Sequence, residues 1–217
     1  MVDVRVSWLT VPKIGHASDR EILSAAERAR ADRFVRREDA VRYEFVRASL
    51  RRHLSDLIGQ SPERIAITVD DHGKPRLTSG GVHFNVSHSH DVAVIAICVD
   101  VPVGVDVERI QPVEAGLVDQ VFSPEEHAAF ARIPEPEQAV AFVRCWCRKE
   151  ALLKGLGVGL TLPMESIAVS LGEVPVVLRS ALGEVDGWQL EALTAAEGYE
   201  AALAVRADGL PVRLDIR

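Results

Sequence analysis

Apolar residues recur along the chain with two periods, which divide it into strands and helices. Runs of alternating apolar and polar residues, and short apolar stretches bounded by turn residues, predict strands near 3–10, 64–69, 82–86, 92–99, 103–109, 165–170, 174–179, 187–193 and 200–206. Apolar residues spaced three and four apart predict helices near 18–31, 38–59, 115–121, 124–132 and 136–155. Because the strands are grouped with flanking helices and do not alternate with them strictly, we expect an α+β fold.

The two halves of the sequence resemble each other at a spacing near one hundred residues. The triplet Phe45–Arg47 in one predicted helix corresponds to Phe142–Arg144 in another. Each helix is followed by a segment of similar sequence, SPERIAITV in the first half and LPMESIAVS in the second. Each half closes on an apolar strand that ends in an aspartate, Asp100 and Asp208. Three matches in the same order indicate an internal duplication.

The duplication predicts a pseudo-twofold pair of subdomains. The step from Asp100 to Pro102 is the expected hinge, and it divides the chain into an N-terminal subdomain of residues 1–101 and a C-terminal subdomain of residues 102–217. Ligand sites often lie in the cleft between two such units.

Composition excludes several classes of protein. The chain is 47% hydrophobic and 26% charged, which is typical of a folded globular protein. Its net charge of −7 does not support a nucleic-acid partner, and no apolar run is long enough to cross a membrane. The cysteines are few and odd in number, and the N-terminus lacks the pattern of a signal peptide, so we expect a cytoplasmic protein.

Arginines are concentrated in one region of this acidic chain. Those between residues 28 and 52 form either a solvated helical surface or a local site for a polyanionic small molecule. Lysine is rare, since four lysines stand against 21 arginines. A lysine kept under that bias indicates a position where a compact ammonium group is needed.

A pair of acidic residues lies on the predicted strand 103–109. Asp106 and Glu108 are two positions apart and share one face of the strand. The alternating valines, Val103, Val105 and Val107, share the other face and are expected to pack in a core. The carboxylates either face water or share a hard cation such as Mg²⁺, which relieves their mutual repulsion.

The predicted helix 136–155 offers a third carboxylate. Trp146, Glu150 and Lys154 follow one another at intervals of four and form a single stripe, with Lys149 beside it. This stripe is either a routine Glu–Lys helix pair beside a core tryptophan or the remainder of a metal and phosphate site.

Two further segments carry groups suited to an anion. Gly73, Lys74 and Pro75 form a turn that presents cations from a rigid bend. In the segment 83–89, polar residues alternate with Phe84 and Val86, and Ser87 and His88 supply donors for phosphate oxygens. The histidines also invite a zinc hypothesis, which lacks a second cluster of suitable ligands.

These motifs together resemble a known family. The segments Gly73–Pro75, Phe84–Ser89, Gly104–Glu108 and Trp146–Lys154 occur in the order found in the surfactin-synthetase-activating (Sfp-type) 4′-phosphopantetheinyl transferases. The resemblance extends from the arginine-rich region to about residue 162. The Trp-x-x-Lys-Glu-Ala form of the last motif resembles the branch common in secondary metabolism.

The resemblance implies an enzyme with a duplicated α+β fold that acts as a monomer. It would transfer the 4′-phosphopantetheine arm of coenzyme A to a serine of an apo acyl, peptidyl or polyketide carrier protein and release 3′,5′-ADP. No nucleic-acid or membrane partner is expected. The resemblance implies Mg²⁺ ligands at Asp106, Glu108 and Glu150. It places coenzyme A against Arg28, Arg30, Arg47, Gly73, Lys74, Pro75, Ser87, His88, Asp106 and Lys154.

The resemblance also implies the catalytic roles. Glu150, or a metal-bound water that it orients, accepts the proton of the carrier serine. Lys154 stabilises the departing phosphate, and Trp146 positions the stripe, with Lys149 as a further catalytic candidate. A phosphohydrolase and a non-catalytic coenzyme A-binding regulator are the competing hypotheses. The second set of phosphate-binding residues disfavours the first, and the complete acidic trio disfavours the second.

Overall fold

We describe a computed structural model that covers residues 1–70, 73–114, 116–158, 162–180 and 185–217. The first half contains β1 (Val2–Thr10), α1 (Ala17–Glu21), α2 (Ala25–Ala31), α3 (Arg37–Ile58), the 3-10 turn η1 (Pro62–Arg64), β2 (Ile67–Val69), β3 (Pro75–Leu77), β4 (Val82–Ser89) and β5 (Val92–Val99). The second half contains β6 (Val103–Arg109), α4 (Leu117–Val121), α5 (Pro124–Phe130), α6 (Glu135–Leu156), η3 (Met164–Ser166), β7 (Ile167–Val169), β8 (Val177–Ser180), β9 (Trp188–Ala192), β10 (Tyr199–Arg206) and β11 (Val212–Ile216). The expected α+β class is confirmed.

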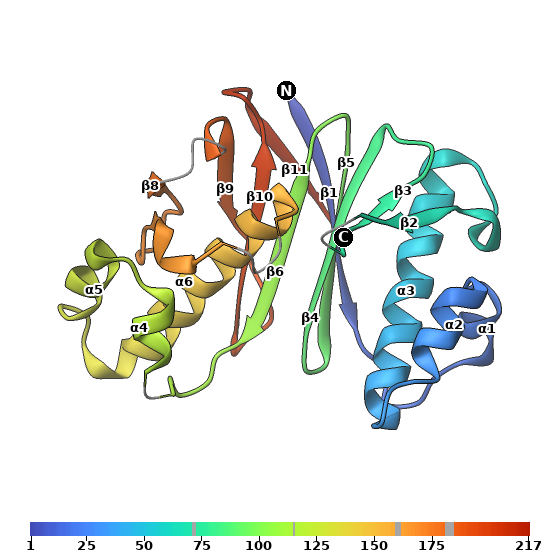
Figure 1. Cartoon of the computed structure of the whole chain (residues 1–217), viewed down its shortest axis with the longest axis horizontal. Coiled ribbons are helices and arrows are strands. Elements are labelled where there is room, and N and C mark those ends of the chain that lie inside the picture. The colour runs from blue at the N-terminus through green and yellow to red at the C-terminus, as the bar shows by residue number, and fades with distance from the viewer. Residues whose placement is uncertain (71–72, 115, 159–161, 181–184) are drawn as a thin grey trace.

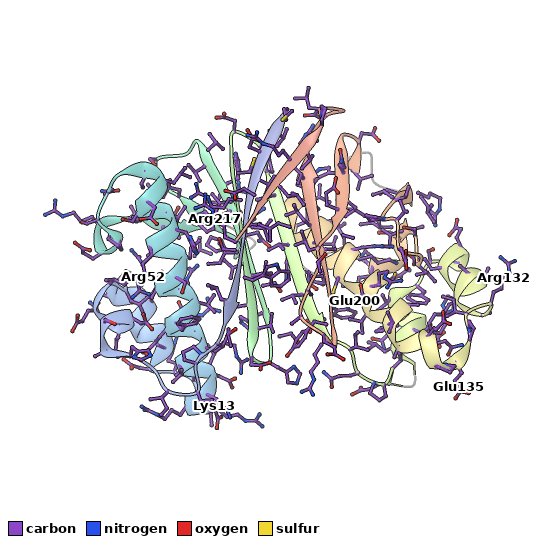
Figure 2. All side chains as sticks on the ribbon, turned by 180° about the vertical axis from the view of Figure 1, so that it is seen from behind. Lys13, Arg52, Arg132, Glu135, Glu200 and Arg217 are labelled. Atoms are coloured by element: carbon purple, nitrogen blue, oxygen red, sulfur yellow. The ribbon has the colours of Figure 1, made fainter. Side chains whose placement is uncertain are left out.

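Two main sheets lie side by side between two long helices (Figure 1), and Figure 2 shows the same arrangement from behind. The first sheet has the strand order β11-β1-β5-β4 and the second has the order β6-β10-β9, and the pairs β2-β3 and β7-β8 form small separate sheets. β4 and β6 are edge strands of their respective sheets, and they run next to each other at the centre of the molecule.

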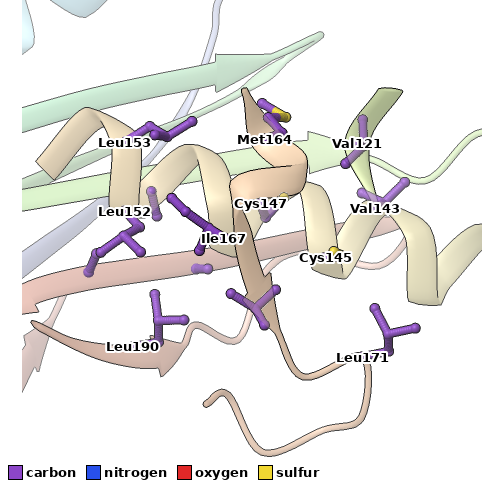
Figure 3. Packing of buried hydrophobic residues seen from close by; sticks show 14 of the residues in the cluster. Val121, Val143, Cys145, Cys147, Leu152, Leu153, Met164, Ile167, Leu171 and Leu190 are labelled. Atoms are coloured by element: carbon purple, nitrogen blue, oxygen red, sulfur yellow. The ribbon is translucent and has the colours of Figure 1, made fainter. Parts of the chain in front are cut away.

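Three apolar clusters hold these layers together. Valines of β1 and β6 pack between the two sheets. The valine side chains of the strand 103–109 therefore face a core, as their alternation predicted. Leu50 and Leu54 of α3 cover the outer face of the first sheet. Cys145, Cys147 and Leu152 of α6 pack against the second sheet and the segment around Ile167 (Figure 3). All three cysteines of the chain are buried thiols.

The order of elements in the first half is repeated in the second, in agreement with the internal duplication predicted from the sequence. α3 and α6 each contain 22 residues and end at a left-handed glycine, Gly59 and Gly157, followed by a 3-10 turn and a short strand. Asp100 and Asp208 follow equivalent strands and both have positive φ, 74° and 48°. When α3 and α6 are aligned by their ends, Phe45 corresponds to Val143. The sequence motifs instead pair Phe45 with Phe142, so the two alignments differ by one residue.

Several elements differ from the expectation. The predicted helix 18–31 is two helices, because Ser24 restarts it with a capping box in which Ser24 and Glu27 bond each other's backbone N–H groups. The strand predicted at 82–86 continues to Ser89, and β3 and β11 lie outside every predicted strand. β11 pairs in parallel with β1, so a segment from the end of the second half completes the first sheet. Among the described residues, no helix is long and apolar enough to cross a membrane.

Candidate active site

The carboxylates of β6 lie where the two sheets meet. Asp106 is only 1% exposed, so the hypothesis that this strand face is simply solvated is wrong for Asp106. Glu108 is half-buried. Burial raises the pKa of Glu108, and the negative charge of Asp106 raises it further against the hydrogen bond from Ser89.

A pair of glycines lets helix α6 approach β6 closely. A Cβ atom added at Gly104 would lie 2.0 Å from the carbonyl oxygen of Ala151 and 2.3 Å from the backbone nitrogen of Gly155. A Cβ atom at Gly155 would in turn lie 2.4 Å from the ring of Trp188. Strand, helix and indole therefore stack at a distance that only glycine permits.

This approach brings a lysine of α6 onto the strand. Lys154 Nζ donates to Asp106 Oδ1 at 2.6 Å and to Ser87 Oγ at 3.0 Å. Ser87 Oγ donates to the same Asp106 oxygen at 2.8 Å. Three residues from three elements thus form one hydrogen-bonded triangle, while Asp106 Oδ2 is buried without a hydrogen-bond partner among the described residues.

Glu150 is the third carboxylate of the group. It is half-buried one turn before Lys154, and its Oε1 atom is buried with no hydrogen-bond partner in the part of the chain that the structure describes. Burial raises the pKa of Glu150, and the charges of Asp106 and Glu108 raise it further while Lys154 opposes them. The expected acidic trio therefore shares one electrostatic environment. Trp146, on the same stripe, lines a hollow together with Glu108 and Phe142.

The donor set suits a hard divalent cation, although it is not gathered tightly around one point. Carboxylate oxygens are the ligands that Mg²⁺ prefers, and buried oxygens on Asp106 and Glu150 lack hydrogen-bond partners within the described ranges. Within the described part of the chain, no three Asp, Glu, His or Cys side chains lie close enough to hold a metal as they stand. The ammonium group of Lys154 is the cation that contacts Asp106 in this arrangement.

His88 lies on the opposite face of β4 from Ser87, toward helix α3. Desolvation by neighbouring groups and then the charge of Arg42 lower the pKa of His88, although the residue is exposed at the edge of the strand. A neutral ring can still donate one hydrogen bond to a phosphate oxygen.

The turn before β3 connects the two halves. Lys74 Nζ donates to the carbonyl of Gly155 at 2.7 Å and more weakly to that of Val103 at 3.4 Å, so it caps the end of α6. Burial lowers the pKa of Lys74 to about 8, with Arg76 contributing. Gly73 has φ 86°, which permits the turn, and Pro75 opens the short strand β3.

The three candidate arginines are held within the helical layer of the first half. Arg28 donates to the carbonyl of Leu23, Arg30 stacks over the ring of Tyr43 at 5.3 Å, and Arg47 lies 3.4 Å from Glu27. Their contacts are with α2, α3 and the adjoining turn, on the His88 side of β4.

Lys149 is not brought to the site. It is completely buried, and its three donors are directed to Glu126 Oε2 at 2.5 Å, to the carbonyl of Val121 at 2.6 Å and to that of Met164 at 3.0 Å. An ammonium group with its three bonds made has no donor left for a phosphate. The geometry therefore gives Lys149 a structural role instead of the expected catalytic one.

Two further residues of the polar segment 83–89 contact β6. The side-chain oxygen of Asn85 accepts a hydrogen bond from the backbone N–H of Val105 at 2.9 Å, and Ser89 Oγ donates to Glu108 Oε2 at 2.7 Å. The sequence placed both residues in this polar segment, but it did not predict their contacts with β6.

Comparison with known proteins supplies the family. The model described as the 4′-phosphopantetheinyl transferase superfamily matches residues 102–204, and the model of the 4′-phosphopantetheinyl transferase N-terminal region matches residues 15–100. The chain belongs to the 4′-phosphopantetheinyl transferase superfamily, and the class of enzyme expected from the sequence is confirmed.

Its relatives include Sfp-type enzymes. The 4′-phosphopantetheinyl transferase HetI of Nostoc sp. is 31% identical over 194 residues, 86% of this chain and 80% of that protein. The transferase Sfp of Bacillus subtilis is 29% identical over 160 residues, 72% of this chain and 71% of that protein. The crystal structure of Thermotoga maritima holo-[acyl-carrier-protein] synthase aligns with 48% of this chain and 61% of its own, at 21% identity and a TM-score of 0.39.

Proposed function

We propose that the chain transfers the 4′-phosphopantetheine arm of coenzyme A to a serine of an apo carrier protein and releases 3′,5′-ADP. The observation that carries this proposal is the triangle of Lys154, Ser87 and Asp106 beside two further carboxylates. It combines a cation and a hydroxyl donor for phosphate oxygens with acidic groups that can bind a metal or take up a proton. Membership of the transferase superfamily supports the same reaction.

The acidic trio is our candidate for the Mg²⁺ site. Asp106, Glu108 and Glu150 would hold the ion, and the unpartnered oxygens of Asp106 and Glu150 support this assignment. When bound, Mg²⁺ neutralises the charge that builds on the phosphoryl oxygens during transfer. Lys154 would give up its contact with Asp106 and turn toward the phosphate.

The transfer step follows from the residues around this site. The serine oxygen of the carrier attacks the β-phosphorus of coenzyme A, and a new P–O bond forms. The bond between that phosphorus and the bridging oxygen breaks, and 3′,5′-ADP leaves with the electron pair. Glu150 is the candidate to accept the serine proton. Lys154 neutralises the charge on the leaving phosphate.

Coenzyme A is proposed to bind along β4. Ser87, His88 and Lys74 would hold its nucleotide and pyrophosphate, and Arg28, Arg30 and Arg47 are candidates for the 3′-phosphate. This site lies between the proposed subdomains 1–101 and 102–217. We further propose that the protein acts as a cytoplasmic monomer on carriers of fatty-acid, polyketide or peptide synthesis.

The proposal is tested by weighing a carrier protein before and after reaction. Purified chain is mixed with apo carrier, coenzyme A and Mg²⁺, and the intact carrier mass is measured. The expected gain is one phosphopantetheinyl group, which disappears when EDTA replaces Mg²⁺. Unchanged masses for acyl, polyketide and peptidyl carriers would refute the transfer, and a gain that survives EDTA would refute the metal.

A further inference from the structure

The edges of the two sheets are joined by side chains from one face of β4. Asn85, Ser87 and Ser89 are alternate residues, each no more than 7% exposed, and all three bond to β6. Asn85 accepts from the backbone of β6, whereas the two serines donate to its carboxylates. β4 and β6 belong to different sheets. Hydrogen bonds from these side chains therefore connect the two strands in place of backbone hydrogen bonds.

Ser89 has both its donor and an acceptor site engaged. Its hydroxyl accepts a hydrogen bond from the backbone N–H of Arg109 at 3.1 Å and donates to Glu108 Oε2 at 2.7 Å. A backbone N–H cannot accept, so this contact directs the hydroxyl proton toward the glutamate. The orientation of the hydroxyl is therefore fixed by the strand that carries Glu108.

The backbone around Ser89 is fixed as well. His90, the next residue, has φ 53°, in the left-handed region that is uncommon for residues other than glycine. Asp91 accepts a hydrogen bond at 2.5 Å from the hydroxyl of Tyr199, on β10. The tip of the β4–β5 hairpin is thus tied to the second half on both sides of the serine.

The two serines differ in what else they contact. Ser87 accepts from Lys154 and belongs to the phosphate-binding triangle. Ser89 contacts Glu108, the Arg109 backbone and the neighbouring His90 ring. Within the described part of the chain, we find no hydrogen bond to the second carboxylate oxygen of Glu108, Oε1.

We propose that Ser89 is a positioning residue that fixes Glu108 as a metal ligand. By holding Oε2, the hydroxyl sets the rotamer of Glu108 and leaves Oε1 for the cation. A glutamate side chain loses rotamer freedom when it binds a metal, and the hydrogen bond imposes part of that loss before the metal arrives. This inference rests on the proposed metal site.

Mn²⁺ binding measures this role apart from turnover. The full chain is titrated with Mn²⁺ at saturating coenzyme A, and free Mn²⁺ is followed by electron paramagnetic resonance. Loss of a hydrogen bond that orients a metal ligand weakens metal affinity by about 10- to 100-fold, and we expect that loss for Ser89→Ala. Ser89→Thr keeps the hydroxyl and should bind Mn²⁺ within about threefold of the wild type.

The matched control is a serine that bonds a glutamate elsewhere. Ser61 hydrogen-bonds the carboxylate of Glu63 on the surface of the first half, so Ser61→Ala removes the same kind of contact away from the site. It should leave Mn²⁺ affinity unchanged. Affinity for coenzyme A without metal and the thermal unfolding midpoint are measured for every variant, since a merely structural role would lower all three quantities together.

Glu108→Gln separates failure of the inference from failure of the proposed site. If this variant loses Mn²⁺ affinity while Ser89→Ala binds like the wild type, the positioning role is wrong and the metal site stands. If Glu108→Gln also binds like the wild type, the metal site itself is wrong. A Ser89→Thr variant as weak as Ser89→Ala would show that the hydroxyl is not what matters.

Discussion

Lys149 Nζ lies 2.5 Å from Glu126 Oε2, and neither side chain is exposed to solvent. Arg51 and Glu27 form the equivalent pair in the first half, 2.7 Å apart. Each glutamate also completes the capping box of a short helix, α2 or α5, so each ion pair joins the start of a short helix to the middle of a long one. The two halves share this arrangement with a different cation in each.

Removing one partner of the second pair should destabilise the protein strongly. Glu126→Gln leaves the ammonium group of Lys149 buried without a counter-charge, which costs about 3–5 kcal/mol of unfolding free energy. Urea denaturation followed by circular dichroism measures the loss. Glu125→Gln, which breaks the exposed pair with Arg179, is the control and should leave the midpoint unchanged. Equal effects of the two substitutions would contradict the structural role of Lys149.

A methyl group at Gly104 should separate strand from helix. Gly104→Ala places a Cβ atom against the backbone of α6, and overpacking of this kind costs about 1–3 kcal/mol. Because Lys154 is carried on that helix, the rate of transfer should fall as well. Gly172→Ala is the control, since a Cβ atom there meets nothing within 4 Å. The close approach would be unimportant if both variants had wild-type stability and turnover.

Glu150→Gln should abolish most of the transfer without unfolding the chain. General base catalysis contributes about 10²–10⁴-fold, and the substitution also removes a proposed metal ligand, so kcat should fall at least that far. Single-turnover assays on an apo carrier give the rate, and circular dichroism checks the fold. Glu137→Gln alters an exposed carboxylate of the same helix and should behave as the wild type. Near-normal turnover of Glu150→Gln would remove this residue from the mechanism.

Lys74 should make stability and substrate affinity respond to pH in opposite directions. Its pKa in the folded state is about 8, below the ordinary value of 10.5, so the unfolded chain binds more protons between these values. The contribution of Lys74 to stability therefore rises from pH 8 to pH 10.5. Over the same range the loss of its charge should raise the KM for coenzyme A.

Lys74→Met tests both parts of this pH prediction. The variant should show a shallower rise of the urea midpoint with pH than the wild type, and a KM that no longer changes above pH 8. A wild-type KM that stays constant between pH 7.5 and pH 9.5 would exclude a charged Lys74 from coenzyme A binding.

The 3′-phosphate assignment can be tested with a truncated substrate. If Arg30 binds that phosphate, Arg30→Ala should raise the KM for coenzyme A about tenfold and leave the KM for 3′-dephospho-coenzyme A unchanged, as expected for one lost charge-assisted contact. Arg33→Ala, an exposed neighbour, serves as the control. An equal rise with both substrates would assign Arg30 to another role, such as stacking on Tyr43.

The sequence predicts best what depends on neighbours along the chain. The helix expected at 38–59 spans Arg37–Ile58, because its apolar spacing is a local signal. The interruption of the predicted helix 18–31 before Ser24 was missed. The apolar spacing predicts one continuous helix there, but the capping box of Ser24 and Glu27 begins a new one. β3 and β11 were also not predicted; β11 forms by pairing with β1, which is far away along the chain, and no local pattern encodes that contact.

The same limit applies to the site. Alternation placed Asp106 and Glu108 on one face, and helical spacing aligned Glu150 with Lys154. The position of Lys149 could not be predicted in this way, because its partner Glu126 is 23 residues away on another helix. The contact of Ser89 with Glu108 depends on two sheets meeting edge to edge, which no local pattern encodes.

The strand β11 has a consequence for how the chain is made. Val2 is in register with Val212, so the first sheet is completed by a strand that is made long after β1. During synthesis one edge of β1 stays unpaired until β11 has emerged. Closing so long a loop is slow. We therefore expect the first sheet to be completed only after β11 has been synthesised, although β1, β5 and β4 are made much earlier.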